Sequence, residues 1–272
     1  MKRISLSILL AFALLLSAIP AETFALPSPA GYIVVLHDSV DSPAAAAREI
    51  ALQVGGKVGF IYEHALKGFS IMVPPQSVAA LEKNPNVKYV ATDDIRYAFA
   101  LSVPTGIQRI FADTNNNIDI DNTDDWRVDV GVAVIDTGID FQHPDLNVVG
   151  GINCAAGNIF RAKCIAGGDD DHYHGTHVAG TIGAIDNGNG VVGVAPGARL
   201  YAVKVLNSRG SGYTSWIVAG IDWVAANAST IEVANMSLGG SGYNQAEYDA
   251  IQGAVNKGVA FAVAAGNNDD NA

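Results

Sequence analysis

A ten-residue run with three closely spaced histidines constrains this chain more than any other stretch. It spans residues 171–180 and reads Asp-His-Tyr-His-Gly-Thr-His-Val-Ala-Gly. His174 is followed by a glycine and then by small and apolar residues at helical spacing, which predicts a histidine in the first turn of a buried helix. The positive end of the helix dipole favours a neutral imidazole, the form that a general base needs.

An apolar run upstream, residues 130–135, predicts a strand that ends on Asp136 and a turn. In open α/β sheets, the carboxyl ends of strands carry the chemistry. An aspartate at a strand end and a histidine at a helix start are two members of a nucleophilic triad, and Asp before His with Ser last is one of its known chain orders. We therefore expect Asp136 and His174 to work as a pair.

Four motifs in this order resemble the subtilisin-like serine proteases: Asp136-Thr-Gly, His174-Gly-Thr-His-Val-Ala-Gly, Ser237-Leu-Gly-Gly and Ala264-Ala-Gly-Asn267. The resemblance runs from about residue 31 to the last residue. It implies an α/β fold, with a parallel-sheet three-layer α/β/α peptidase domain preceded by a small α+β, ferredoxin-like propeptide. It also implies that Asp136 and His174 are catalytic and that the amide of Asn267 stabilises the oxyanion.

Three segments are expected: a signal peptide over 1–25, a propeptide over 26–100 and an incomplete peptidase domain over 101–272. Lys2 and Arg3 followed by a short apolar stretch predict an export signal cleaved after Ala25 or Ala21, with an uncleaved membrane anchor as the alternative. We expect a secreted monomer without stable membrane insertion. The resemblance implies that the propeptide is a folding chaperone and an intramolecular inhibitor.

The propeptide segment has the pattern of a compact βαββαβ unit. The predicted strands are 32–36, 58–62, 69–73 and 87–90, and the predicted helices are 43–54 and 77–82. The stretches 66–69 and 86–90 resemble phrases of the family's propeptides; an unrelated small domain is the alternative. Residues 98–101 resemble the linker where the family is cut, and 103–107 resemble the start of the mature enzyme.

Two glycine-rich segments resemble the backbone stretches that flank a peptide substrate in this family. Glycine lets a second main chain approach closely, and an extended edge can pair with it. Ordinary glycine-rich loops are the alternative for each segment alone, but together they favour a cleft for polypeptide substrates. The expected substrate-binding residues are Gly210, Ser211, Gly212, Ser237, Leu238, Gly239 and Gly240. Further strands are predicted over 201–206 and 261–267, and helices over 215–226 and 245–257.

The family's nucleophile is a serine in a Gly-Thr-Ser element beyond the oxyanion asparagine, and no serine follows Asn267 in this sequence. We therefore expect a fragment of a secreted serine endopeptidase that is inactive by itself. One alternative is a truncated, non-catalytic relative that binds or inhibits a protease. The other is a metal hydrolase with zinc on Asp136, His174 and His177.

A loop after His174 resembles the one that supplies calcium ligands in the family. Its oxygens align without gaps from the histidine motif, and hard oxygen ligands suit Ca²⁺. The expected ligands are Asp145, Ile185, Asn187, Asn189 and Val191, with a metal-free glycine-rich turn as the alternative. Residues 113–124 also alternate oxygen side chains, but Ile118 takes the glycine position of a calcium loop. A solvated acidic loop is expected there, with calcium binding as the alternative.

Two features complete the sequence prediction. Cys154 and Cys164 are the two cysteines of the chain, and in an exported protein a pair this close most often forms a disulfide; free thiols or a metal role are the alternatives. A net charge of −11 and a pI near 4.8 argue against a nucleic-acid-binding surface.

Overall fold

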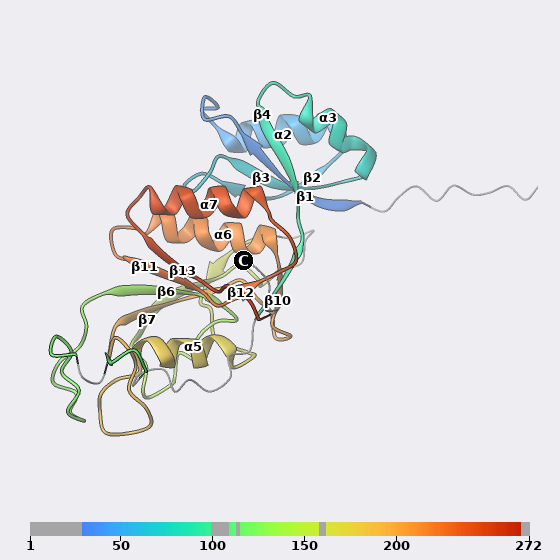
Figure 1. Cartoon of the computed structure of the whole chain (residues 1–272). Helices are drawn as coiled ribbons and strands as arrows, with labels where there is room; N and C mark the ends of the chain where they lie inside the picture. The colour runs from blue at the N-terminus through green and yellow to red at the C-terminus, as the bar shows by residue number, and fades with distance from the viewer. Residues whose placement is uncertain (1–28, 99–108, 113–114, 158–161, 268–272) are drawn as a thin grey trace, which may run out of the picture.

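The computed structural model describes residues 29–98, 109–112, 115–157 and 162–267 (Figure 1). The expected signal peptide, the cut near Ala100 and the start of the mature enzyme lie outside these residues. None of the helices in the described ranges is both long enough and apolar enough to cross a bilayer.

The N-terminal unit has the predicted βαββαβ order. It comprises β1 (Ala30–Leu36), α2 (Pro43–Val54), β2 (Lys57–Tyr62), β3 (Gly68–Val73), α3 (Val78–Glu82) and β4 (Val87–Thr92). The strands pair antiparallel in the order β2-β3-β1-β4. Ser42 caps α2 by accepting a hydrogen bond from the amide of Ala45, and Gly55 ends the helix in the left-handed conformation. Local capping signals therefore set the boundaries of this helix.

A six-stranded sheet forms the centre of the second unit. Its strands are β6 (Gly131–Asp136), β7 (Val148–Asn153), β8 (Ile165–Ala166), β9 (Arg199–Lys204), β11 (Val233–Met236) and β13 (Ala260–Val263). Their order is β13-β11-β6-β9-β7-β8, and only β8 runs antiparallel to its neighbour. The central strand β6 is buried along its whole length, as expected for a parallel strand with both faces covered.

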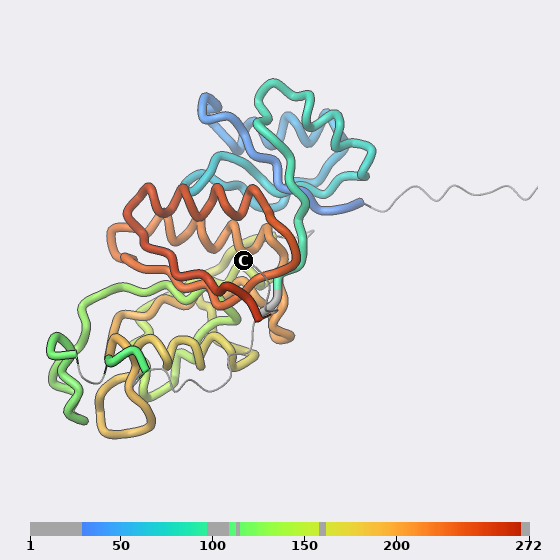
Figure 2. The backbone as a smooth tube through the Cα atoms, in the orientation of Figure 1, coloured from blue at the N-terminus to red at the C-terminus, as the bar shows by residue number. Residues whose placement is uncertain are grey.

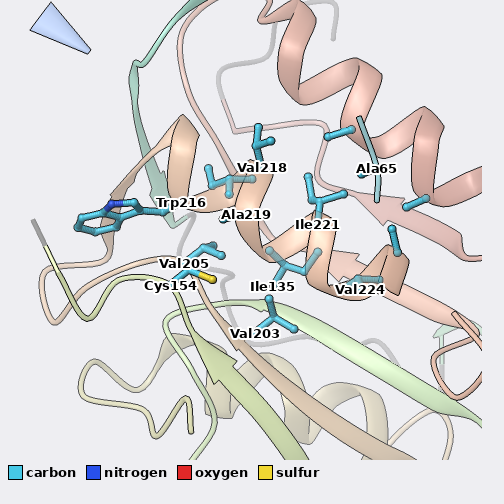
Figure 3. Close-up of a cluster of buried hydrophobic side chains, with 14 of the residues drawn as sticks. Ala65, Ile135, Cys154, Val203, Val205, Trp216, Val218, Ala219, Ile221 and Val224 are labelled. Atoms are coloured by element: carbon cyan, nitrogen blue, oxygen red, sulfur yellow. The ribbon is translucent and has the colours of Figure 1, made fainter. Parts of the chain in front are cut away.

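Helices cover both faces of this sheet, which confirms the three-layer α/β/α architecture (Figure 1). α6 (Thr214–Ala226) and α7 (Gln245–Val255) lie on one face, and α5 (His174–Gly183) lies on the other. Alternate residues of β6 serve the two sides: Ile135 packs in the cluster with α6, and Val134 packs in the cluster with α5. The close-up of the first cluster shows Ile135 and Val203 beneath the side chains of α6 (Figure 3).

The N-terminal unit sits on the α6/α7 face (Figure 2). β2 packs against α6, and Ala65 joins the same buried cluster as Ile221 and Val224 of that helix. Gly253 of α7 makes the close approach possible, because a Cβ at this position would collide with the carbonyl of Ala65. One hydrophobic cluster therefore spans both units, while the α2 side of the N-terminal sheet has a separate cluster of its own.

Some predicted boundaries are wrong at their C-terminal ends, and tertiary contacts set where the elements end. The helix that begins at His174 ends at Gly183, because Ala184 leaves it to form a bridge with Leu146. β9 ends at Lys204, because the next two amides turn to donate to the carbonyl of Asp136. β13 ends at Val263 instead of reaching residue 267.

Candidate active site

Asp136 and His174 meet at the carboxyl edge of the central sheet. The distance from His174 Nδ1 to Asp136 Oδ1 is 2.8 Å. Asp136 is fully buried, and His174 is 4% exposed. The sequence motifs, 38 residues apart, thus form one hydrogen-bonded pair, in which a buried carboxylate can fix the tautomer and orientation of an imidazole.

Backbone geometry brings the start of α5 against the turn that follows β6. Thr137 donates its amide proton to Asp136 Oδ1 at 2.6 Å, and its hydroxyl accepts from the amide of Gly175 at 2.9 Å. Gly175 lies so close to the carbonyl of Gly138 that a Cβ could not fit between them. A glycine is therefore required after His174 for the start of α5 to pack against the turn that follows Asp136.

Asp170 organises the first turn of α5, a role that the sequence analysis missed. One of its carboxylate oxygens accepts from the amides of His172 and Tyr173 and from the Thr137 hydroxyl; the other accepts from the amide and hydroxyl of Thr176. Burial alone would raise the pKa of Asp170, but these hydrogen bonds hold the pKa below its ordinary value. An acidic residue just before a helix was the available signal.

The two glycine-rich segments lie on either side of one strand from the N-terminal part of the chain. That strand is β5 (Ile95–Ala98), which pairs antiparallel with β10 (Ser211–Tyr213) and with β12 (Leu238–Gly239). Gly210 and Gly240 adjoin these strands. The arrangement is β-augmentation within a single chain, with β5 as an extended segment between the two glycine-rich stretches.

Polar contacts fasten β5 and the preceding residues to α6 and α7. Arg96 forms a buried ion pair with Glu247 at 3.1 Å, and the Tyr89 hydroxyl donates to Asp249 at 2.6 Å. Asp93 accepts the amide of Ser215 at 2.6 Å in the first turn of α6. Burial raises the pKa of Asp93 to about 6, although the hydrogen bonds with Ser215 act in the opposite direction.

A second anchor joins the loop after β2 to the middle of α6. Asp222 Oδ1 accepts from the amides of His64 and Ala65, both at 2.7 Å, and Asp222 is nearly buried. A carboxylate that satisfies two backbone donors in a buried interface is a strong and directional contact.

The remaining predicted site residues have simpler surroundings. Asn267 lies exposed, four residues beyond the end of β13, and within the described ranges it donates no hydrogen bond to the Asp136–His174 pair. His177 is also exposed. In the part of the chain that the structure describes, no group of three or more His, Cys, Asp or Glu side chains converges to hold a metal, so the zinc alternative has no site there.

The five expected calcium ligands lie on two neighbouring segments. Asn187 Nδ2 is 2.9 Å from Asp145 Oδ1, and the amide of Ile185 donates to the carbonyl of Asp145 at 3.0 Å. Asn189 and Val191 are exposed on the same loop. These hydrogen bonds join the two segments, with the amide nitrogen of Asn187 facing Asp145 and its amide oxygen accepting from the amide of Asn189. Carboxylate, amide and carbonyl oxygens are the ligand types that suit Ca²⁺.

The acidic loop before β6 is largely exposed in its described part, 115–124. It is held by Asp186, whose Oδ2 accepts from the amides of Asp121 and Asn122 at 2.7 and 2.9 Å. These contacts use a carboxylate to fix the backbone of the loop, in keeping with the expected solvated surface loop.

Cys154 and Cys164 form the predicted disulfide, so the free-thiol and metal alternatives are wrong. Cys154 is fully buried at the end of β7 and packs in the core cluster beside α6. Beyond the bridge, the insert touches the N-terminal unit: a Cβ at Gly59 would lie 3.1 Å from the Cβ of Ala162.

An open hollow of about 1050 Å³ lies along α5. Its lining mixes apolar groups of the helix and the loop after it with polar groups from the segment before His174. The lining includes Asp145, Asp171, Thr176, Gly180, Ala184 and Val191. Two of the candidate calcium ligands, Asp145 and Val191, and the start of α5 thus border the same space.

The fold and these motifs match known proteases. A model of the subtilase family matches residues 128–272, and one of the peptidase inhibitor I9 family matches residues 31–99. Subtilisin E of Bacillus subtilis is 40% identical over 237 residues, which cover 87% of this chain and 58% of the relative. M-protease of Shouchella clausii is 41% identical over 198 residues, covering 73% of this chain and 48% of the relative.

A solved structure agrees with this relationship. Fervidolysin from Fervidobacterium pennivorans, described as a keratinolytic enzyme related to subtilisin, superposes with a TM-score of 0.66 at 25% identity. The match covers 89% of this chain and 40% of fervidolysin. The chain spans about half the length of the curated relatives that it matches. With an inhibitor I9 domain ahead of its peptidase domain, it belongs to the subtilase family.

Proposed function

We propose that this chain is part of the zymogen of a secreted serine endopeptidase. The observation that carries the proposal is the position of β5, which lies between β10 and β12 as a peptide substrate would. The buried Asp136–His174 pair supplies the matching chemistry. The relatives named above and the I9 match support the same activity and the same order of domains.

In this mechanism His174 is the general base. It accepts the proton of a serine hydroxyl as that oxygen attacks the scissile carbonyl carbon, and it returns the proton to the leaving amine. Asp136 orients the imidazole through Nδ1 and stabilises the imidazolium. Asn267 would donate its amide to the developing oxyanion. Residues 210–212 and 237–240 would hold the substrate backbone.

The domain boundaries follow from the same proposal: a signal peptide over 1–25, an inhibitory propeptide over 26–100 and the peptidase domain from 101 onward. The docking surface of the I9-like unit is already occupied within the chain through Asp222 and Asp93. That occupation favours inhibition of its own peptidase domain over inhibition of another protease.

The test begins with the transcript downstream of the Ala272 codon, where we expect an open frame that encodes a Gly-Thr-Ser element. The protein expressed from that frame should react with a fluorophosphonate and cut itself near Ala100. The 272-residue chain is expected to do neither, because no serine follows Asn267. Self-processing by the purified 272-residue chain would contradict the assignment of the nucleophile. A stop codon directly after Ala272 would favour the protease-binding alternative.

We also propose a structural Ca²⁺ site at Asp145 and loop 185–191. The donor set fits, since a nearly buried carboxylate faces a loop rich in carbonyl and amide oxygens. A bound ion would fasten that loop to the segment before β7. Calcium titration of the chelator-treated chain should raise its melting temperature, and Asp145→Ala should remove that response. Equal responses of the chain and the variant would count against the site.

A further inference from the structure

Lys204 is a buried cation beside the candidate catalytic pair, with no part in the chemistry described above. It ends β9 and pairs in register with Asp136 on β6. Residues in register on parallel neighbouring strands point to the same face, so both side chains lie on the α5 side of the sheet. Lys204 is 4% exposed. A lysine is rarely buried to this extent unless its ammonium group is fully used.

Three oxygens surround the ammonium group. Lys204 Nζ donates to the carbonyl of Thr137 at 2.5 Å, to the carbonyl of Leu206 at 2.9 Å and to Asp171 Oδ1 at 2.5 Å. An ammonium group has three protons to donate, and these three acceptors match them. The site is thus satisfied by one charged partner and two backbone carbonyls.

These acceptors belong to the segments that hold the pair in place. Thr137 directly follows Asp136 and donates its amide proton to the carboxylate. Asp171 lies three residues before His174, next to Asp170, which organises the first turn of α5. One ammonium group therefore joins the turn that carries the carboxylate to the segment that starts the histidine helix.

We propose that Lys204 is a positioning residue, which fastens the Asp136 turn to the start of α5 and so fixes the Nδ1–Oδ1 hydrogen bond. The significance of that bond rests on the proposed function, but the bond itself exists without a nucleophile. Asp170 joins the same two segments through neutral donors, whereas Lys204 is the charged link. Loss of this link should loosen the pair without unfolding the sheet.

The test uses the 272-residue chain and the low-field proton NMR signal of His174 Nδ1–H, assigned by its loss in His174→Ala. Lys204→Met keeps the length and apolar stem of the side chain but removes all three donors. In a folded variant we expect the signal to shift and its exchange with water to rise about tenfold or more. An unchanged signal in folded Lys204→Met would overturn the proposal.

Asp171→Ala is the second variant, in case the buried carbonyls left by Lys204→Met prevent folding. Asp171 is exposed, so its replacement leaves the core intact. Faster exchange at Nδ1–H would support the link, and an unchanged rate would overturn it. Asp169→Ala is the matched control, because Asp169 lies two residues before Asp171 and accepts from the amide of Phe141 instead of from Lys204; it should leave the signal unchanged. Fluorophosphonate reactivity of the longer protein separately tests the proposed enzyme, so either proposal can fail alone.

Discussion

The two faces of the central sheet are built for different tasks. On the α6/α7 face, the N-terminal unit adds a further layer, with a shared apolar core and carboxylates that bind backbone amides. On the α5 face lies the buried Asp136–His174 pair, and an open hollow of about 1050 Å³, which neither member of the pair lines, runs along α5. One face carries the docking contacts and the other the pair to which we assign the proposed chemistry, and β5 lies at the carboxyl edge of the sheet between β10 and β12.

Docking of the N-terminal unit and orientation of His174 depend on different contacts, so each can be altered separately. The polar contacts that dock the N-terminal unit come mainly from α6 and α7, whereas the contacts that orient His174 come from β6, β9 and the segment before α5. A change on one face should therefore leave the measurements that report on the other face unchanged.

The largest effect is expected on the chemical face. His174→Ala in the extended enzyme should lower kcat by about 10⁶-fold, a magnitude that comes from subtilisin itself. The reason is the loss of the general base, and burst kinetics with a chromogenic peptide would measure it. Hydrogen exchange in β2 should stay as in the parent, since docking is on the other face. Near-normal turnover would exclude His174 as the base.

On the docking face, Asp222→Ala should reduce the free energy that stabilises docking of the N-terminal unit by about 3 kcal/mol, since two buried amides lose a charged acceptor. The expected readout is faster amide exchange at His64 and Ala65 and along β2. The His174 Nδ1–H signal should not change. Asp222→Asn keeps an acceptor oxygen, so its amide exchange rates should lie between those of the parent and of Asp222→Ala. Identical exchange rates in all three proteins would show that the anchor is dispensable.

Removal of the disulfide should also act on the docking face. A bridge across a sequence separation of 10 is worth roughly 2.5–3 kcal/mol by loop entropy, so Cys154→Ala with Cys164→Ala should lower the free energy of unfolding by about that amount. Denaturant unfolding would measure it. Exchange at Gly59 should rise as well, because the insert contacts that residue through Ala162. Unaltered exchange at Gly59 would show that the disulfide stabilises the insert without affecting the N-terminal unit.

The smallest expected effect is a pH dependence from Asp93. An acid whose pKa is raised in the folded chain binds its proton more tightly when folded than when unfolded, so stability falls as pH rises from about 4 to about 6. We expect a loss of about 2 kcal/mol, discounted for partial exposure of the side chain. The free energy of unfolding of Asp93→Asn should lack this fall between about pH 4 and pH 6. Equal pH slopes in the parent and the variant would refute the prediction.

Periodic and capped segments could be predicted from sequence, as α2 shows with Ser42 before it and Gly55 after it. The pairing of Asp136 with His174 followed from strand-end and helix-start signals together with the family motifs. Contacts between distant segments could not be predicted in this way. Nothing local in the sequence shows that Asp222 accepts the amides of a loop 158 residues away.

The contacts of Lys204 could not be predicted from the sequence either. A single lysine within the apolar stretch 201–206 was the visible signal, but periodicity gives no partner for it. Its acceptors are a turn carbonyl, a loop carbonyl and a carboxylate, and they come together only once β6, β9 and the start of α5 are in place. Site residues that act through tertiary contacts need the folded chain to be recognised.

The strand β5 competes with any free peptide for the position between β10 and β12. Only Asp93 and Asp94 separate it from β4, so the docked N-terminal unit holds it at a fixed place from its N-terminal side. A segment tethered so closely is present at an effective concentration in the millimolar range, and a free peptide must exceed that level to displace it. Cutting the chain beyond β5 leaves this tether intact. In the proposed zymogen, a peptide substrate should therefore reach the cleft only when the N-terminal unit departs as a whole.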